Sequence, residues 1–463
     1  MLFPTITFAV FFVVVFLANW FLMPFPRPWR WFMLGASYFF YGFWSWRFVG
    51  LIVLSTLVNQ FCAVRIAQAP ADRERRAWVA TAVVANLGML GYFKYYGFFV
   101  ESINGVLEGL GMDASLPLLQ VTLPVGISFF TFQALSYVID VYRRKLQPAP
   151  PLDFAVYLAF FPQLVAGPIV RGTELLPQFR GRRDPRRIDA SRAFYLIAIG
   201  LAKKVVIADF LAANLVDAVF ASPGQYGNIE ILVAIYAYSV QIYADFSAYS
   251  DIAIGVALLL GFRFPDNFNA PYTAVSISDF WRRWHMTLSR WLRDYLYVPL
   301  GGNRGGALLT RRNLMLTMLL GGLWHGAAWR FVIWGGLHGL WLVWERRRGP
   351  SRAPVWLQRV ATFHLVTFAW VFFRAESLST AGELIGRLFT AWGGGVDDLS
   401  ISIVLAVAVG IGAQYVTRPA VDRVLAGFSR LAPVAQGATL AVTFLVIDSL
   451  ANEGVAAFIY FQF

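Results

Sequence analysis

The chain has 463 residues, of which 58% are hydrophobic and only 14% are charged, and its formal net charge is +13. Soluble proteins carry about 25% charged residues, so this composition excludes a soluble globular protein and indicates a polytopic membrane protein. The single cysteine, Cys62, excludes an intrachain disulfide framework. The basic residues lie in short loops beside apolar segments, as the positive-inside rule predicts, which accounts for the charge without nucleic-acid binding.

Apolar segments of about 20 residues, the length that crosses a bilayer as a helix, recur along the sequence. The first, residues 6–25, is longer than a signal-peptide core and precedes Arg27 and Arg30, which predicts a retained span and an external N-terminus. Further spans are expected at about residues 31–46, 48–67, 78–100, 121–142, 193–220, 229–262, 360–373, 401–416 and 435–450. With two broken segments they predict an all-α membrane protein of about eleven or twelve transmembrane helices, forming one domain over residues 1–463 with an external C-terminus.

Two apolar segments differ from ordinary spans. Residues 152–170 contain Pro162, Gly167 and Pro168 and have basic clusters on both sides, which is typical of a re-entrant segment. Residues 313–344 are too long for one span and short for two, and arginines flank both ends, so we expect this segment to enter the membrane and return. Non-helical backbone at membrane depth must be buried in protein or line a wet cavity, so these segments are expected to surround a central tunnel.

The second broken segment contains the sequence Gly-Gly-Leu-Trp-His-Gly-Ala-Ala-Trp at residues 321–329. Its histidine, His325, lies about 20 Å from the membrane surface if the chain is helical from Arg312. An ionisable side chain at that depth is costly, which makes it a candidate functional residue; the alternative is a core histidine that hydrogen-bonds across helices. The flanking glycines admit other backbone or a substrate and favour function, and imidazole is suited to general-base catalysis near neutral pH.

A second histidine, His285, lies in an arginine-rich segment, residues 278–295, that is expected on the cytoplasmic side. Ser278 is a predicted N-cap, and an apolar stripe at helical spacing predicts one continuous helix. The stripe consists of Phe280, Trp284, Leu288, Trp291 and Tyr295. Spacing alone favours an interfacial helix on the cytoplasmic leaflet. The alternative is a helix that closes an inner vestibule, directs His285 at a cofactor and offers Arg282 and Arg283 to phosphates.

The other polar residues of the apolar segments have simpler interpretations. His338 could orient the site, although a packing role is favoured, and His364 receives no role. Asp245 and Asp251 are expected to be structural partners buried in the bundle. The sequence contains no P-loop, no HExxH, no Cys/His metal spacing and no GxSxG, so no metal is expected at the site.

Residues 458–463 read Phe-Ile-Tyr-Phe-Gln-Phe and place one hydroxyl, that of Tyr460, among phenylalanines. One interpretation is an aromatic belt at the outer membrane interface. The other is functional. A phenol has a pKa of about 10, so a nearby histidine base activates Tyr460 more readily than an aliphatic alcohol.

Several long motifs resemble the membrane-bound O-acyltransferase (MBOAT) family, and in particular its bacterial branch that O-acetylates alginate, cellulose or peptidoglycan. They lie at residues 123–133, 161–171, 245–255, 279–297, 299–304 and 322–329, so the resemblance extends over nearly the whole chain. The resemblance implies the MBOAT fold. It matches His325 to the family's invariant histidine and His285 to its second polar position, which moves the interpretation of His285 towards function. It also implies that Tyr460 belongs to a C-terminal aromatic motif whose tyrosine is proposed to carry the acyl group.

The activity that the resemblance implies is transfer of an acyl group, here acetyl, from cytoplasmic acetyl-CoA to an extracytoplasmic acceptor across the bacterial inner membrane. We expect the thioester to reach His285 and His325 to act as the general base that removes the proton of the incoming hydroxyl, that of Tyr460 or of a partner's serine. Trp324 and Asn267 are candidates for binding the cofactor and stabilising the oxyanion. No tightly bound cofactor is expected. Because no soluble domain is predicted, we expect an extracytoplasmic transferase of the SGNH type as a partner that passes the acetyl group to the polysaccharide.

A solute transporter is the alternative function, because re-entrant segments and polar groups near the midplane also suit a solute pathway. Transporters of this size commonly show related halves, and the sequence has no internal repeat, which favours the enzyme. A purely structural scaffold of a secretion complex is a third possibility, under which His325 would be replaceable.

Overall fold

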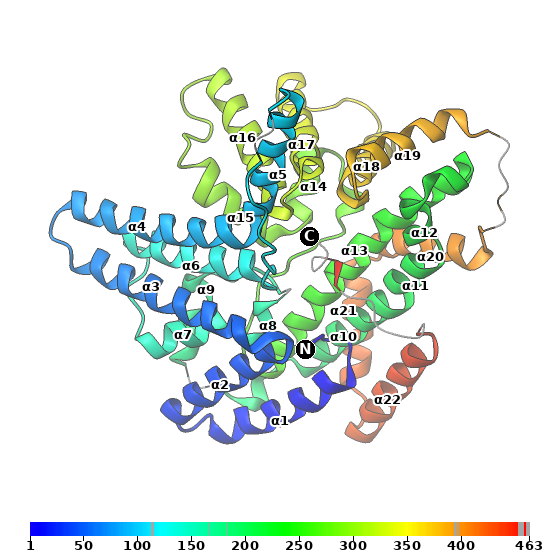
Figure 1. Cartoon of the computed structure of the whole chain (residues 1–463). Coiled ribbons are helices and arrows are strands. Elements are labelled where there is room, and N and C mark those ends of the chain that lie inside the picture. The colour runs from blue at the N-terminus through cyan, green and yellow to red at the C-terminus, as the bar shows by residue number, and fades with distance from the viewer. Residues whose placement is uncertain are drawn as a thin grey trace. The chain divides into compact units, whose positions relative to one another are not determined.

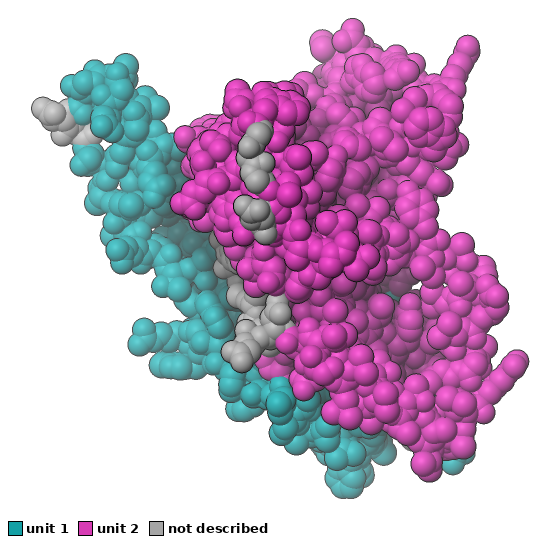
Figure 2. All heavy atoms as spheres, turned by 90° about the vertical axis from the view of Figure 1, so that its right-hand side faces the viewer, with its two compact units in different colours: residues 1, 6–188, 260–264 teal, residues 2–5, 189–259, 265–463 magenta. Residues whose placement is uncertain are grey.

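The computed structural model describes residues 1–112, 115–165, 167–181, 183–392, 396, 398–451 and 458–459. Every regular element in these ranges is a helix, which confirms the all-α prediction. The chain divides into two compact units, shown in different colours in Figure 2. Residues 1, 6–188 and 260–264 form the first unit, and residues 2–5, 189–259 and 265–463 form the second. The single membrane domain expected for residues 1–463 stays a prediction.

The first unit contains the helices that precede residue 188. They are α1 (Ile6–Leu22), α2 (Pro26–Ser45), η1 (Trp46–Phe48), α3 (Val49–Gln68), α4 (Asp72–Leu90), η2 (Gly91–Tyr95), α5 (Tyr96–Gly109), α6 (Ile127–Tyr142), α7 (Pro151–Ala159), α8 (Phe161–Leu164), α9 (Gly172–Leu175), η3 (Leu176–Phe179) and η4 (Pro185–Arg187). Helices α3, α4 and α6 lie side by side (Figure 1). Asn59 on α3 and Asn86 on α4 exchange side-chain hydrogen bonds of 3.3 and 2.8 Å, and such polar pairs hold apolar helices together.

The expected re-entrant segment, residues 152–170, is broken as predicted. Helix α7 ends before Phe160, whose ψ of 109° is not helical, and the described residues after the single turn of α8 are not helical either. All described residues from 153 to 170 are buried, so the broken backbone is covered by protein. Gly126, at φ +74°, packs against this break, since a Cβ there would lie 2.6 Å from the carbonyl oxygen of Leu164. Helix α6 therefore begins after this glycine, later than the expected start at residue 121.

The second unit is built around α13, a largely buried helix of 32 residues that packs against α10, α18, α19 and α20 (Figure 1). Its helices are α10 (Ala190–Leu201), η5 (Ala202–Ala208), α11 (Asp209–Leu211), η6 (Ala212–Val216), α12 (Asp217–Ala221), η7 (Pro223–Gln225), α13 (Asn228–Leu259), η8 (Pro271–Thr273), α14 (Ile277–Arg283), α15 (Met286–Leu292), η9 (Arg293–Tyr297), α16 (Ala307–His325), α17 (Trp329–Arg348), α18 (Val355–Arg374), α19 (Leu378–Thr390), α20 (Ile401–Gly412), η10 (Ala413–Tyr415), α21 (Arg418–Ser429) and α22 (Pro433–Ser449). The expected span at residues 193–220 is thus a helix interrupted by two π-helical segments, η5 and η6.

Helices α16 and α17 form the hairpin that was expected for residues 313–344. Glycine is required where the two helices touch. A Cβ on Gly322 would lie 2.2 Å from the carbonyl oxygen of Phe331, and one on Gly335 would lie 2.2 Å from that of Met318. His325 is the last residue of α16, so it lies at the tip of the hairpin, where the chain turns into α17.

By length and composition, three helical stretches of the described chain can cross a membrane: Pro26–Gln68, Asn228–Leu259 and Val355–Arg374. Helix α21 is bent by 92° from the stretch Ile401–Tyr415, and the pair counts as a fourth candidate if it is one span. Some of the other expected spans are shorter apolar helices, such as α1, α6 and α22. Others are divided by π-helical turns. The protein is therefore a multi-pass, all-helical membrane protein with several broken helices.

Candidate active site

The segment that carries His285 forms two short helices. Between α14 and α15, Trp284 is extended and His285 adopts a left-handed conformation at φ +40°, so the single helix expected over residues 278–295 is wrong. Such a conformation costs of order 1–3 kcal/mol for a residue other than glycine, and the contacts of His285 must offset that cost. Ser276 caps α14, since its Oγ accepts a hydrogen bond from the N–H of Asp279 at 3.0 Å, so the expected N-cap at Ser278 is wrong as well.

The apolar stripe of this segment faces the protein interior. Phe280, Trp284 and Leu288 are fully buried, and Trp291 and Tyr295 are nearly so. The ring of Trp284 lies 5.1 Å from that of Phe268 and 5.0 Å from that of Trp370, measured between centroids. A helix lying on the leaflet would turn this stripe towards lipid, so the interfacial interpretation is wrong.

Asn267 determines which nitrogen of His285 carries the proton. The side-chain oxygen of Asn267 accepts the backbone N–H of Thr287 at 3.2 Å and its hydroxyl at 2.8 Å. Because a backbone N–H can only donate, this contact assigns the oxygen end of the amide. The same oxygen lies 3.1 Å from Nδ1 of His285, which must therefore donate. Burial lowers the pKa of His285 to about 3, so the ring is neutral and its lone pair is on Nε2.

The amide nitrogen of Asn267 donates to the Ser250 hydroxyl on α13 at 3.0 Å. Both ends of this side chain thus connect His285 to the rest of the unit, and Asn267 itself is only 1% exposed. The ring of Phe246, also on α13, meets the imidazole of His285 edge-to-face at 4.6 Å between centroids. His285 is therefore held from two sides in its left-handed conformation.

Trp324 contacts both histidines that the sequence singles out. Its ring centroid lies 6.1 Å from that of His285 and 5.0 Å from that of His325. Trp334 and Phe373 also meet the His325 ring edge-to-face, at 5.0 and 5.4 Å. The structure thus brings Asn267, His285, Trp324 and His325 into one group of neighbouring side chains, which we call the histidine cluster.

The histidine cluster is covered by protein. His285 is 0% exposed and His325 is 3% exposed. An acyl donor or an acceptor can reach either ring only if covering side chains move, and the rings that lie against His325 include Trp334 and Phe373. The central tunnel stays a prediction.

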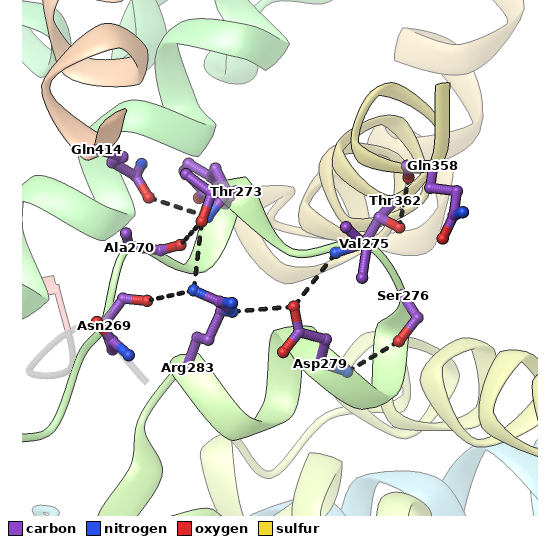
Figure 3. A network of polar contacts seen from close by, with 11 residues as sticks. Asn269, Ala270, Thr273, Val275, Ser276, Asp279, Arg283, Gln358, Thr362 and Gln414 are labelled. Carbon is purple, nitrogen blue, oxygen red and sulfur yellow. Dashed lines mark hydrogen bonds and ion pairs between the residues drawn. The ribbon is translucent and has the colours of Figure 1, made fainter. Parts of the chain in front are cut away.

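The two arginines proposed for cofactor binding differ in their surroundings. Figure 3 shows Arg283 in a network of polar contacts: its Nε lies 2.9 Å from Oδ2 of Asp279, and a terminal nitrogen lies 3.4 Å from Oγ1 of Thr273 and 3.5 Å from the carbonyl oxygen of Asn269. Arg283 thus holds the chain before α14 in place. Arg282 is exposed on the same helix, so it is the more available of the two for a phosphate.

The described residues of the C-terminal segment lie inside the second unit. Phe458 is fully buried and Ile459 is 3% exposed. The ring of Phe458 lies 5.7 Å from that of Phe246, which in turn contacts His285. These two residues do not form part of an external aromatic belt. Tyr460, the next residue in the sequence, lies outside the described residues.

Three residues of this site have no individual role predicted from the sequence: Phe246, Thr287 and Phe373. The first two lie within motifs that carry the family resemblance, so the motifs could have pointed to them. Phe373 comes from the ordinary span α18 and has no local signal. His338, for which packing was favoured, is buried among aromatic rings, and its Nδ1 accepts a hydrogen bond from the indole N–H of Trp281 at 3.3 Å.

Comparison with known proteins identifies the family. The profile of the membrane-bound O-acyltransferase family (MBOAT) matches residues 118–378. The chain is 43% identical over 405 residues to the probable alginate O-acetylase AlgI of Azotobacter vinelandii, covering 86% of this chain and 80% of that protein. It is 45% identical over 395 residues to the probable alginate O-acetylase AlgI of Pseudomonas aeruginosa, covering 84% and 75%. It is also 39% identical over 394 residues to the peptidoglycan O-acetyltransferase of Helicobacter pylori, covering 78% and 73%. The protein therefore belongs to the membrane-bound O-acyltransferase family and is a membrane-embedded O-acyltransferase.

Proposed function

We propose that this protein transfers an acetyl group from acetyl-CoA, on the cytoplasmic side of a bacterial inner membrane, to an acceptor on the outer side. The acetyl group would serve O-acetylation of an exopolysaccharide or cell-wall polymer such as alginate, cellulose or peptidoglycan. The observation that carries the proposal is the histidine cluster, in which a neutral imidazole of assigned tautomer and a second histidine share one tryptophan neighbour. Similarity to alginate and peptidoglycan O-acetylating proteins supports the class of acceptor.

His325 is assigned as the general base and Tyr460 as the first acceptor. His325 takes the proton of the phenol, the phenol oxygen attacks the thioester carbonyl carbon, and the carbon–sulfur bond breaks. The proton then passes to the sulfur, so the products are free CoA and an acetyl ester of the tyrosine. A hydroxyl of a partner transferase next attacks this ester, and its proton returns to the tyrosine oxygen.

The remaining residues of the histidine cluster are assigned to binding and positioning. His285 contacts the donor, since its unprotonated Nε2 can accept a hydrogen bond from an amide N–H of the pantetheine arm. The indole N–H of Trp324 is a donor only, which suits the oxyanion of the transition state. Asn267 acts through His285 as a positioning residue because its oxygen already serves His285 and Thr287. Arg282, the exposed arginine of α14, is assigned to the phosphates of CoA.

Delivery to the polymer is assigned to a separate extracytoplasmic transferase of the SGNH type. The sequence predicts membrane helices and short loops, without a soluble domain to bind a polysaccharide. We place the N-terminus and the C-terminus on the outer side of the membrane. A tunnel to His325 would open when the side chains that cover it move.

Substitution of His325 tests the assignment of the base. Purified protein would be supplied with radiolabelled acetyl-CoA and the partner transferase, and release of free CoA would be measured. His325→Ala should lower turnover by about 10²- to 10⁴-fold, the usual contribution of general-base catalysis, without changing thermal unfolding. Wild-type turnover in this variant would refute the role, and solute flux without any acyl turnover would favour a transporter.

Substitution of Tyr460 tests the relay separately. Tyr460→Phe removes one oxygen and little volume, so it should abolish the labelled acetyl-tyrosine ester and polymer acetylation together. Polymer acetylation at the wild-type level would reject the relay and leave Tyr460 as an anchor at the membrane interface.

A further inference from the structure

The second unit contains a buried group of charges made of Lys204, Asp209 and Asp245, which we call the ion cluster. The Lys204 ammonium lies 2.7 Å from Oδ1 of Asp209 and 3.0 Å from Oδ1 of Asp245. None of the three side chains is more than 7% exposed. The two carboxylates thus share the ammonium of Lys204, in a place where a charged side chain is costly to bury without partners.

A main-chain donor near the C-terminus contacts one of these carboxylates. The backbone N–H of Ile459 donates to Oδ2 of Asp245 at 2.8 Å in a buried hydrogen bond between residues 214 positions apart. Hydrogen bonds to charged groups are stronger than neutral ones. Asp245 therefore uses one oxygen for Lys204 and the other for the chain end.

The same contact accompanies the packing of Phe458 against α13, close to the histidine cluster. Phe458 packs its ring 4.3 Å from that of Tyr249 and 5.7 Å from that of Phe246, between centroids. Phe246 follows Asp245 on α13 and lies 4.6 Å from the ring of His285. One aromatic ring thus separates Phe458 from the imidazole.

We infer that the ion cluster is a latch for the backbone at residue 459: Asp245, oriented by Lys204, captures the N–H of Ile459 and so fixes Phe458 and Ile459, the residues that precede Tyr460 in the sequence, beside Phe246. The inference rests on the proposed function for its consequence in acyl transfer, but the latch is a physical contact that can be measured without turnover. Recognition is through the main chain, so it does not depend on the side chain at position 459.

A second ion pair on the same helix shows what is specific to the ion cluster. Asp251, also on α13, forms an ion pair with Lys203, the neighbour of Lys204 in the sequence. Here one carboxylate contacts one ammonium. The side chain of Asp251 and that of Lys203 are about one-fifth exposed (20% and 19%), and the ammonium also donates to Ser247 at 2.9 Å. Among the described residues, this pair receives no hydrogen bond from Phe458 or Ile459. Asp251 is therefore the matched control for Asp245.

Hydrogen–deuterium exchange of the C-terminal peptide tests the latch in the full-length protein in detergent. In Asp245→Ala, exchange of the segment containing Ile459 should accelerate by about ten- to hundredfold, as expected for loss of a hydrogen bond to a charged group. Asp245→Asn keeps an acceptor oxygen and should show an intermediate rate. Asp251→Ala should exchange as the wild type does. Equal rates in Asp245→Ala and wild type, or the same acceleration in Asp251→Ala, would overturn the inference.

Substitution of the donor tests the latch without touching the buried charges, in case Asp245→Ala does not fold. Ile459→Pro removes the N–H, whereas Ile459→Ala keeps it. The proline variant alone should lose protection across the segment and lower kcat at least tenfold with the KM for acetyl-CoA unchanged. Protection that survives in Ile459→Pro, or is lost equally in Ile459→Ala, contradicts the latch. Full acyl transfer by Tyr460→Phe would refute the relay in the proposed function but not the latch, because exchange protection is measured without turnover.

Discussion

The side-chain oxygen of Asn267 lies 3.1 Å from Nδ1 of His285 and orients that imidazole from a position 18 residues earlier in the chain. The amide, itself fixed by Thr287 and Ser250, thereby decides which edge of the ring carries a lone pair. A buried neutral histidine of defined tautomer is a better-organised partner for a substrate than a freely titrating one.

Removal of the Asn267 amide should impair catalysis more than folding. Asn267→Ala deletes the acceptor that holds Nδ1, so we expect kcat to fall about tenfold or more, equivalent to the roughly 1.4 kcal/mol of one hydrogen bond. Thr287→Val keeps the backbone N–H and removes only the hydroxyl, and it should change kcat much less. Steady-state release of CoA measures both, and equal losses in the two variants would contradict a positioning role for Asn267.

Acid should destabilise the protein partly through His285, which lies outside the candidate membrane spans. Burial lowers its pKa from 6.5 to about 3. Below pH 6.5 the unfolded chain binds a proton that the folded ring does not, so stability falls as the pH drops from 6.5 towards 3. His285→Asn removes this titration, and its unfolding temperature should decline less between pH 7 and pH 5 than that of the wild type.

The contact between α16 and α17 should tolerate no side chain at Gly335. Gly335→Ala places a methyl group 2.2 Å from a backbone oxygen of Met318, so the hairpin must separate, and we expect a loss of at least about 2 kcal/mol. The neighbouring Gly336→Ala meets only a Leu319 methyl at 3.5 Å and should change stability little. Thermal unfolding in detergent compares the two, and a smaller loss at Gly335 than at Gly336 would be inconsistent with the close packing.

Substitutions of the two adjacent arginines of α14 should have different effects, one on donor binding and the other on stability. Arg282→Ala removes an exposed cation and should raise the KM for acetyl-CoA severalfold at unchanged unfolding temperature. Arg283→Ala removes the contacts to Asp279 and Thr273 and should cost about 1 kcal/mol of stability. Initial rates at varied acetyl-CoA and thermal unfolding provide the two readouts, and an unchanged KM in Arg282→Ala would remove this residue from the donor site.

The apolar runs in the sequence predict the positions of most helices, because a membrane span must be long and apolar wherever it occurs. The span expected at residues 229–262 is α13, and the hairpin predicted around His325 is α16 and α17. The broken segment at residues 152–170 was also foreseeable, since proline and glycine interrupt helices by their own backbone chemistry.

The break at His285 had no such local signal. The apolar stripe continues through it with helical spacing, and His285, in its left-handed conformation, contacts Asn267, 18 residues earlier in the chain. The hydrogen bond between Ile459 and Asp245 joins residues 214 positions apart, so only the folded chain reveals it. Tertiary contacts outweighed local propensity at both places.

The packing of Trp334 and Phe373 against His325 has a consequence for how much of the thioester donor is lost to hydrolysis. A thioester held near an imidazole is at risk of hydrolysis whenever a water molecule can reach the same ring. With the ring only 3% exposed, the resting protein keeps water away from the proposed base, so the proposed donor, acetyl-CoA, should resist hydrolysis until an acceptor displaces the aromatic cover.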